Sequence, residues 1–173
     1  MDLIVRCVVR SSELSVAFTK EESAETASET LLPDRPISEH LNLVTEQGFK
    51  ALERQLQEAK TAFEAAQKTD DINERRRLSA VPLRDMRYLS ERVRTAQVIA
   101  APDGAEIVAF GSTVTFSRAD GREQSYQIVG EDEADPKAGS ISFVSPVARA
   151  VMGKGVGDMV TAGNQTIEII AIA

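Results

Sequence analysis

Residues 44–66 read VTEQGFKALERQLQEAKTAFEAA, and this stretch decides the fold of the first half of the chain. Its apolar residues recur at spacings of 3, 4, 3, 4 and 3, which form a heptad stripe on one face of an α-helix. The stripe consists of Phe49, Leu52, Leu56, Ala59, Phe63 and Ala66. Thr45 is suited to cap the helix, and Glu46 suits its positive end. A stripe this narrow predicts a helix that packs against a single partner helix.

A second heptad segment downstream supplies that partner. Its apolar residues, spaced by 3, 4 and 3, are Met86, Leu89, Val93 and Ala96. Two such segments joined by a short polar stretch predict an antiparallel helical hairpin, or coiled coil. Pro82 limits the second helix, because proline costs ~3 kcal/mol inside a helix but is tolerated in its first turn. We therefore expect this helix either to begin near residues 79–82 or to continue upstream with a kink.

The sequence after residue 100 predicts a β-rich domain. Apolar and polar residues alternate in 114–116 and again in 126–128, and Asp120-Gly121 between them supplies a turn, so this is a candidate β-hairpin. Further short strands are expected at 107–110, 140–143, 158–161 and 166–172.

A short helix is predicted between the later strands. Ser145 is its expected cap, Pro146 suits its first position, and an apolar segment runs on to Met152. A twisted antiparallel sheet packing on one short helix, preceded by the helical hairpin, is an α+β fold.

Residues 1–41 are predicted to be an irregular acidic leader. Its glutamates lie among Ser, Thr and Ala and are followed by Pro33 and Pro36, a composition that buries little apolar surface. These glutamates are Glu21, Glu22, Glu25 and Glu29. The chain is therefore expected to divide into the leader (1–41), a coiled-coil arm (42–100) and a β domain (101–173).

The overall composition restricts the class of partner. The net charge of -7 argues against direct binding of nucleic acid, which needs clustered Lys and Arg to neutralise phosphates. Any DNA binding is therefore expected to pass through a protein partner. No apolar run approaches the ~20 residues of a membrane span, residues 1–10 are too charged for a signal peptide, and Cys7 has no second cysteine to pair with. We expect a cytoplasmic protein.

Several separate motifs resemble, in the right order, the Gre family of bacterial transcription elongation factors (GreA and GreB). They are VTEQGF at 44–49, RYLSERV at 87–93, AQVI at 96–99, YQIVGEDEADP at 126–136 and SPVARA at 145–150. Multiple ordered motifs are more specific than one short pattern. The match covers roughly Val44 to Ala173, and it implies a C-terminal fold similar to that of FK506-binding proteins.

The resemblance also implies a function. In the Gre family the globular domain binds the rim of the secondary channel of RNA polymerase, and the arm enters the channel. Acidic residues at the arm tip help to hold a catalytic Mg²⁺ in the polymerase active site and so promote cleavage of backtracked RNA. This chain would then modulate polymerase catalysis, with no catalytic residue and no stably bound metal of its own.

The candidate tip residues are acidic. The family tip carries an Asp and a Glu three residues apart, and Asp71 and Glu74 keep this spacing, with Asp70 adjacent. Residues i and i+3 share a helix face, so the two carboxylates could hold a hard cation that is partly coordinated elsewhere. The structural alternative is that Asp70 and Asp71 end one helix and cap the next, while Glu74 pairs with an arginine of residues 75–77.

Two departures from the family pattern bear on transcript cleavage. Matching both ends of the arm leaves about two heptads missing, one per helix, which shortens the arm by ~10 Å at 1.5 Å per residue. A metal ligand lies within ~2–2.6 Å of its ion, so side-chain motion cannot absorb that deficit. In addition, Arg75, Arg76 and Arg77 stand where the family has Asn, an acid and an aromatic residue, and these cations would repel Mg²⁺. Cleavage stimulation is therefore expected to be weak or absent.

The resemblance places a polymerase contact at the start of the short helix, with Ser145, Pro146 and Arg149 as candidates. The acidic loop 131–135 is expected to be a solvated turn or, alternatively, a contact with basic polymerase surface. Two rival functions stay open: a short-armed Rnk-like polymerase regulator without cleavage stimulation, and a prolyl isomerase of the FK506-binding type. The isomerase is disfavoured because such sites are apolar pockets lined by aromatic residues, which are few here.

Overall fold

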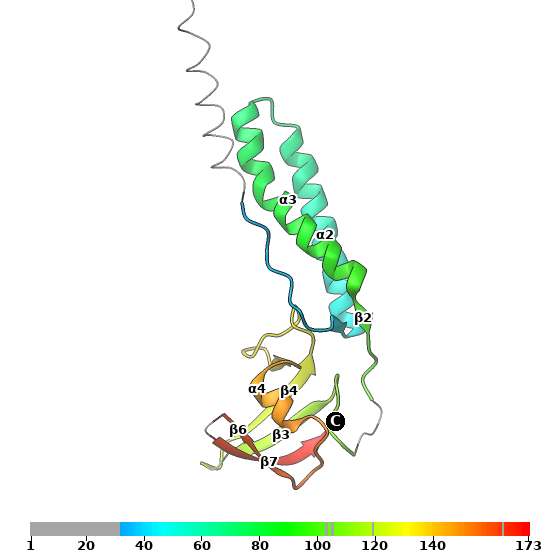
Figure 1. Cartoon of the computed structure of the whole chain (residues 1–173), viewed down its shortest axis with the longest axis vertical. Coiled ribbons are helices and arrows are strands. Elements are labelled where there is room, and N and C mark those ends of the chain that lie inside the picture. The colour runs from blue at the N-terminus through cyan, green and yellow to red at the C-terminus, as the bar shows by residue number, and fades with distance from the viewer. Residues whose placement is uncertain (1–31, 103, 105, 119, 164) are drawn as a thin grey trace, which may run out of the picture.

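A helical hairpin projects from a small β domain (Figure 1). The computed structural model describes residues 32–102, 104, 106–118, 120–163 and 165–173, so the predictions made for residues 1–31 lie outside the described residues. Residues 32–41 contain no helix or strand and run beside the hairpin (Figure 1).

The hairpin consists of α2 (Glu46–Gln67) and α3 (Ile72–Thr95). As predicted, Thr45 caps α2, since its hydroxyl accepts a hydrogen bond of 3.0 Å from the amide of Gly48. Pro82 lies inside α3, so the helix continues upstream to Ile72, and the alternative start near residues 79–82 is wrong. The cost of proline is offset because α3 packs on α2 along the hairpin.

The two heptad stripes meet between α2 and α3. Leu52 and Leu89 are buried there together with Val44. The partly buried residues that pack on them are Phe49, Leu56, Ala59, Tyr88, Val93 and Ala96. Phe63, farther along α2, is only half-buried. Ala66, near the tip, is buried as well, so it is the large buried apolar side chains that lie toward the base of the arm.

A small parallel sheet closes the base of the arm. It pairs β1 (Leu43–Val44) with β2 (Gln97–Val98), the segments just before α2 and just after α3. Further backbone hydrogen bonds from Gln97 to Asn42 (2.8 Å) and from Ile99 to Val44 (2.9 Å) extend the pairing. Both ends of the hairpin are thereby held together.

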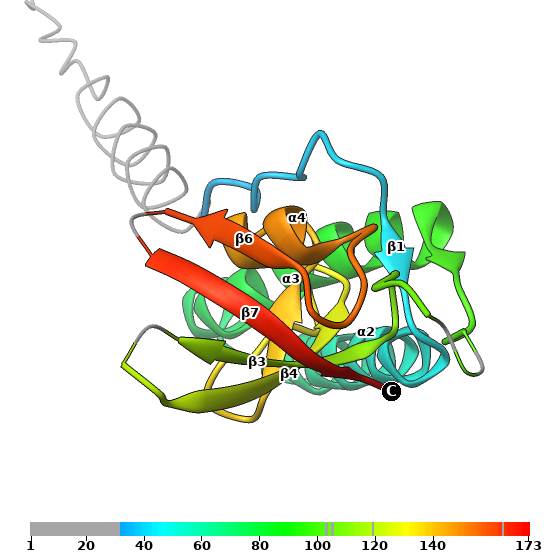
Figure 2. The ribbon, with the colours of Figure 1, turned by 90° about the horizontal axis from the view of Figure 1, so that it is seen from below.

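The C-terminal domain contains a five-stranded sheet in the order β5-β4-β3-β7-β6. Its strands are β3 (Thr113–Arg118), β4 (Glu123–Val129), β5 (Ser140–Ser142), β6 (Met159–Ala162) and β7 (Gln165–Ile172). The predicted hairpin is confirmed, because β3 pairs antiparallel with β4 across the turn at Gly121, whose φ of 78° suits glycine. Seen from below in Figure 2, the curled sheet lies across the end of the arm.

The sheet follows the predicted antiparallel arrangement except at one edge, so it is mixed. β5 pairs in parallel with β4, with Ile128 opposite Ile141. A parallel neighbour needs a connection that returns the chain to the same end of the sheet, and residues 130–139 provide it. The acidic loop is therefore a crossover connection.

The strand predicted at 107–110 is also absent from the described structure. Only an isolated bridge joins Ile107 to Gly155, with backbone hydrogen bonds between Val108 and residues 153–154. The pairing ends there because Gly153 and Gly157, both with positive φ, turn the partner segment away.

The short helix α4 (Pro146–Val151) covers the concave side of the sheet core. As predicted, Ser145 caps it and Pro146 takes its first turn. Ala148 and Val151 are fully buried against the sheet, and α4 lies beside β6 (Figure 2). The buried sheet residues are Val108, Val114, Phe116, Ile128, Ile141, Val160, Ile167 and Ile169.

Candidate functional site

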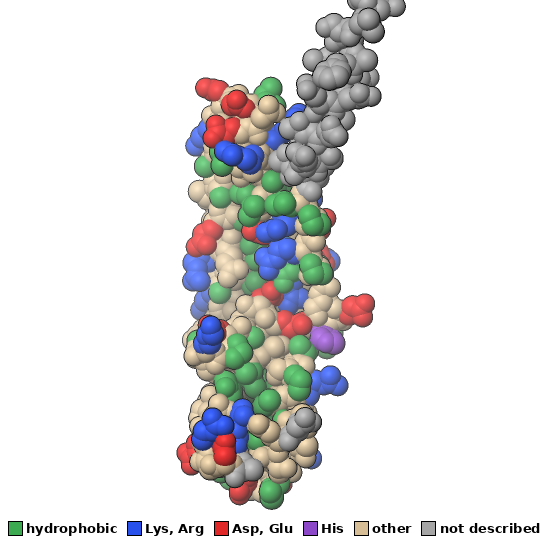
Figure 3. All heavy atoms as spheres, turned by 90° about the vertical axis from the view of Figure 1, so that its left-hand side faces the viewer, with side chains coloured by type: hydrophobic (Ala, Val, Ile, Leu, Met, Phe, Trp, Pro, Cys, Tyr) green, Lys and Arg blue, Asp and Glu red, His purple; other side chains and the backbone are tan. Residues whose placement is uncertain are grey.

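The predicted acidic residues lie at the far end of the arm from the sheet. Asp70 and Asp71 occupy the turn between α2 and α3, Glu74 lies in the first turn of α3, and all three are exposed. Acidic side chains are visible at that end in Figure 3, with basic side chains just below them. The arm therefore presents its carboxylates to solvent at its most distant point (Figure 1).

Asp71 is the N-cap of α3. Its Oδ1 accepts hydrogen bonds from the backbone amides of Asn73 (2.8 Å) and Glu74 (2.9 Å). These two amides, that of Glu74 most strongly, lower the pKa of the Asp71 carboxyl below its usual value. Glu74 lies 3.7 Å from Arg77. In the free arm, Asp71 therefore caps α3 and Glu74 pairs with Arg77, as the structural alternative predicted. The second carboxylate oxygen of Asp71, Oδ2, remains open to solvent.

A second cluster, at the base of the arm, was not anticipated as such. Both oxygens of Glu133 turn inward to the start of α2: Oε1 accepts from the amide of Thr45 (2.8 Å) and Oε2 from its hydroxyl. The amide of Gly130 also donates to Oε1, at 3.3 Å. A carboxylate of the C-terminal domain thus binds the residue that caps α2.

Glycine at position 48 makes this contact possible. A Cβ on Gly48 would lie 1.9 Å from Cδ of Glu133, and one on Gly130 would lie 2.4 Å from the carbonyl oxygen of Leu43. Glycine inside a helix costs about 1 kcal/mol relative to alanine, so its presence in the first turn of α2 needs a packing reason. The close approach of Glu133 is that reason.

Asp132 makes the neighbouring contact with α3. It accepts hydrogen bonds from Nε of Arg92 and from the hydroxyl of Tyr88, each at 2.5 Å. The side chain of Arg92 is only 2% exposed and that of Asp132 12%, so this is a buried ion pair. Burial and the contact with Asp132 raise the pKa of Tyr88 to about 12. We call Thr45, Gly48, Tyr88, Arg92, Asp132 and Glu133 the base cluster.

For Asp132 and Glu133, both predictions are wrong: the acidic loop is neither a solvated turn nor a contact with polymerase at these two residues. These two residues are partly buried, and their carboxylates bind the arm of their own chain rather than an outside partner. Asp135 instead orders the loop, since its carboxylate accepts from the amide of Lys137 (3.0 Å).

The residues proposed for the channel rim lie around α4. The hydroxyl of Ser145 is used to cap α4 and accepts from the amide of Ala148 (3.3 Å), whereas Pro146 and Arg149 are exposed. Large apolar side chains that are exposed in the same domain are Ile107, Met152, Val156 and Met159. Met152 directly follows α4, so Pro146 and Arg149 share this part of the domain with exposed apolar surface.

Comparison with known proteins decides the family. Residues 102–173 match the family model described as transcription elongation factor GreA/GreB, C-terminal. The transcription elongation factor GreA of Desulfovibrio desulfuricans is 35% identical over 149 residues, which cover 75% of this chain and 92% of the relative. The chain belongs to the GreA/GreB family of transcription elongation factors. GreA of Bacillus licheniformis is similarly close, at 36% identity over 151 residues, 75% of this chain and 95% of the relative.

Solved structures of Gre factors are also similar. GreA factor homolog 1 (Gfh1) of Thermus thermophilus is 23% identical, with a TM-score of 0.37, over 76% of this chain and 97% of that one. The GreA/GreB factor of Nitrosomonas europaea is 20% identical, with a TM-score of 0.36, over 76% and 98%.

Membership in the Gre family answers the question of catalysis. Gre factors are non-enzymatic modulators of RNA polymerase, so the prolyl isomerase alternative is excluded. The aromatic residues agree, since Phe110 and Phe116 are buried and pack against Phe143 and Tyr126 respectively. Nothing in these matches supports DNA binding by the chain itself. None of the helices described in this Gre factor is long and apolar enough to cross a membrane.

Proposed function

We propose that this Gre factor binds the rim of the secondary channel of RNA polymerase through its C-terminal domain and inserts its arm, with weak or no stimulation of transcript cleavage. The observation that carries the proposal is a projecting helical hairpin with exposed acidic residues at its tip. Such a partner places the protein in the bacterial cytoplasm.

The length of the arm is the first argument for weak cleavage. At 1.5 Å per residue, the 22 residues of α2 span only ~33 Å. The GreA match from Desulfovibrio desulfuricans runs over 149 residues but takes up 75% of the 173 residues here, which is about 130. About 19 positions of the matched span therefore have no counterpart in this chain. A deletion shared between both helices of the arm would account for them.

The chemistry of the tip is the second argument. Asp70 and Oδ2 of Asp71 are free to contact a cation, so these residues fit a Mg²⁺ that the polymerase already holds in part. Such an ion would stabilise the attacking and leaving oxygens during RNA hydrolysis. Arg75, Arg76 and Arg77 follow Glu74 directly in α3, however, and Glu74 is paired with Arg77. These charges weaken the attraction for a cation.

The surface around α4 supports the docking half of the proposal. Pro146 and Arg149 are exposed, and Met159 and Val156, 70% and 61% exposed, lie in the segments that follow α4. An apolar surface with a polar margin is typical of a protein interface. Arg149 would supply the charged contact at that margin.

A transcript-cleavage assay on stalled elongation complexes of the cognate polymerase tests the tip. We expect little cleavage from the wild type and no further loss in Asp71→Asn. This variant is the better test than Asp71→Ala, because asparagine keeps the helix cap while removing the charge. Robust cleavage that Asp71→Asn abolishes would overturn the weak-cleavage proposal, and Asp70→Asn would then show whether the neighbouring carboxylate substitutes.

A competition assay tests the docking surface separately. A GreA protein with full cleavage activity should lose that activity when this chain is added in excess, because both occupy the same rim. Arg149→Glu should abolish the competition, while Arg54→Glu, on the exposed side of α2, should not. Competition that is unaffected by Arg149→Glu would place the contact elsewhere, and the absence of any competition would contradict rim binding.

The second candidate function is that of a short-armed competitor, which occupies the channel without any effect on cleavage. It is favoured by the three arginines at positions 75–77, which suit contacts with acidic groups better than with a metal ion. Both candidates block GreA in the competition assay, so the cleavage assay distinguishes them: low but measurable cleavage by the wild type indicates a weak stimulator, and no cleavage indicates a pure competitor.

A further inference from the structure

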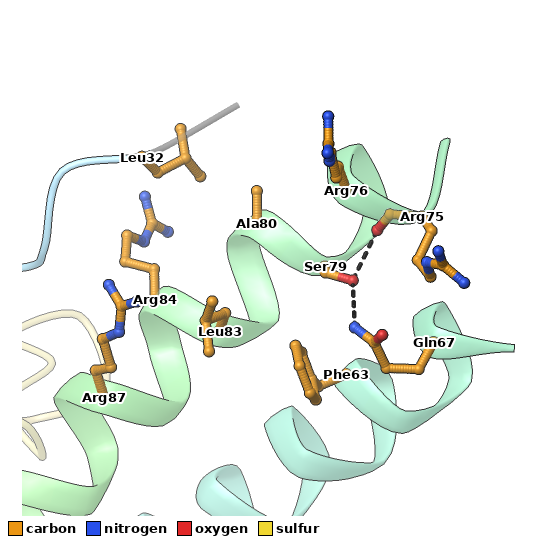
Figure 4. Close-up of a pocket in the computed structure, with 10 residues that line it drawn as sticks. All are labelled: Leu32, Phe63, Gln67, Arg75, Arg76, Ser79, Ala80, Leu83, Arg84 and Arg87. Atoms are coloured by element: carbon orange, nitrogen blue, oxygen red, sulfur yellow. Dashed lines mark hydrogen bonds between the residues drawn. The ribbon is translucent and has the colours of Figure 1, made fainter. Parts of the chain in front are cut away.

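A groove of about 410 Å³ runs along α3 in the outer half of the arm. Its apolar floor includes Phe63, Ala80 and Leu83, and its polar wall contains four arginines (Figure 4). These arginines are Arg75, Arg76, Arg84 and Arg87. A groove that combines an apolar floor with cations on one face of a helix suits an extended acidic peptide with apolar side chains.

One end of this groove already holds a segment of the same chain. Leu32 lines it, and the following residues lie along α3 toward the base of the arm (Figure 4). Asp34 pairs with Arg87 at 3.0 Å, and the guanidinium of Arg35 lies 3.7 Å from the centre of the Tyr88 ring. The last described residues of the leader therefore pack on the arm in an ordered way.

The direction of this segment brings the preceding residues toward the tip arginines. Position 34 lies beside Arg87 and Leu32 lies in the groove, so the chain runs toward the tip as residue numbers fall. From Arg84 back to Arg76 is ~12 Å along α3, at 1.5 Å per residue. An extended chain covers this distance in about four residues. A segment of about four residues before Leu32 is thus long enough to reach Arg76 and Arg75.

The charges in the two segments are complementary. Within the described part of the chain, Arg75 and Arg76 have no carboxylate partner, whereas Arg87 has Asp34 and Arg84 has Asp85. The leader carries Glu29 three residues before Leu32, and Glu25 lies four residues before Glu29. Leu32 lines the groove, and another leucine, Leu31, precedes it in the sequence.

We propose that residues 21–31 bind in this groove of their own chain, with Glu25 and Glu29 paired to Arg75 and Arg76. The leader then forms a strap along α3 from the base of the arm to its tip. It neutralises the two arginines in the free protein and covers one side of the surface that any channel partner of the arm would contact. This proposal does not depend on how the arm acts on polymerase.

A spin label tests the strap in the full-length chain without polymerase. In a Cys7→Ser, Thr30→Cys variant labelled with ¹⁵N, a nitroxide at residue 30 should broaden the amide signals of Ser79 and Ala80. The broadening should disappear in Arg75→Glu/Arg76→Glu and in ~1 M salt, where charges are screened beyond ~3 Å. Arg54→Glu, a single charge reversal on an exposed part of α2, should leave it intact.

Charge exchange provides the sharper test. Glu25→Lys/Glu29→Lys should also abolish the broadening, and combining it with Arg75→Glu/Arg76→Glu should restore it. Unchanged amide signals of the sheet residues Val114 and Ile128 verify that each variant is folded. The proposal is overturned if no broadening occurs, or if it persists after either charge reversal. Broadening of ¹⁵N chains by a nitroxide on separate unlabelled chains would place the leader on a second copy and would equally overturn it.

Discussion

Both carboxylate oxygens of Glu133 bind Thr45, one at its amide and one at its hydroxyl, across 88 positions of sequence. Thr45 in turn caps α2 through the amide of Gly48. The first turn of the arm is thereby joined to the loop that leaves β4. This relationship connects the arm directly to the C-terminal domain.

Removal of the Glu133 carboxylate should destabilise the protein. In Glu133→Ala the part-buried amide of Thr45 loses its acceptor, and leaving such a donor unsatisfied costs about 1–3 kcal/mol. Chemical denaturation, followed by circular dichroism, measures the change in the free energy of unfolding. Glu123→Ala, at an exposed position of β4, is the control and should change it little. Equal effects of the two substitutions would contradict the assigned role of Glu133.

Gly48 and Glu133 should be energetically coupled. Gly48→Ala gains up to about 1 kcal/mol of helix propensity, but its Cβ would overlap the Glu133 carboxylate and displace it from Thr45. We therefore expect Gly48→Ala to destabilise the wild type and to be neutral or stabilising in the Glu133→Ala background. A double-mutant cycle of unfolding free energies measures this coupling. Simple additivity would show that the two side chains do not meet.

Asp132 should contribute more than Glu133, because it neutralises a buried guanidinium. Asp132→Ala leaves Arg92 charged, 2% exposed and without its acid, and removing one partner of a buried ion pair costs about 3–5 kcal/mol. Arg92→Leu/Asp132→Leu, which removes both charges, should recover part of the loss. Denaturation curves of the single and double variants provide the measurement, and a loss below about 1 kcal/mol in Asp132→Ala would contradict the burial of this pair.

Stability should fall in alkaline solution as Tyr88 titrates. Its pKa in the folded protein is raised from 10.0 to about 12, so the unfolded chain loses this proton first. The contribution is fully present below pH 10 and is lost as the pH rises toward 12. Tyr88→Phe should make the unfolding free energy less dependent on pH in this window. Tyr126→Phe, at the other tyrosine, is the control and should preserve the dependence of the wild type.

The cap of α3 should be sensitive to acid. The pKa of Asp71 is lowered in the folded protein, so its contribution to stability is present above the ordinary value of 3.8 and is lost as the pH falls through the lower folded value. Asp71→Ala should lower the thermal midpoint at neutral pH, whereas Asp71→Asn should retain it and lose the acid sensitivity. Equal midpoints for the alanine and asparagine variants would show that the side chain does not cap.

The arm could be predicted from sequence because its determinants are local. The heptad spacing from Phe49 onward and the capping chemistry of Thr45 depend on neighbours within a few turns of the helix. The sequence does not determine the start of α3, because a proline at position 82 is compatible with a helix start and with a helix interior. Only the packing against α2 decides between them.

The base cluster could not be predicted because its partners are far apart in sequence. An acidic loop looks the same whether it faces solvent or an amide 88 positions away. One signal was available in Gly48, a residue that weakens the first turn of α2 and therefore indicates a close approach. The parallel pairing of β5 could not be predicted for a similar reason, because the sequence of a three-residue strand does not indicate whether its neighbour runs parallel or antiparallel.

Among the described residues, the parallel pairing of Leu43–Val44 with Gln97–Val98 and the base cluster attach the arm to the C-terminal domain at the root of the hairpin. Beyond that root, the described residues of α2 and α3 contact each other and the segment at residues 34–35. A heptad could therefore be inserted into or deleted from both helices in register, changing reach by ~10 Å, without any adjustment of the sheet. The length of the arm and the binding surface of the C-terminal domain can thus evolve independently, and a lineage can lose one while it conserves the other.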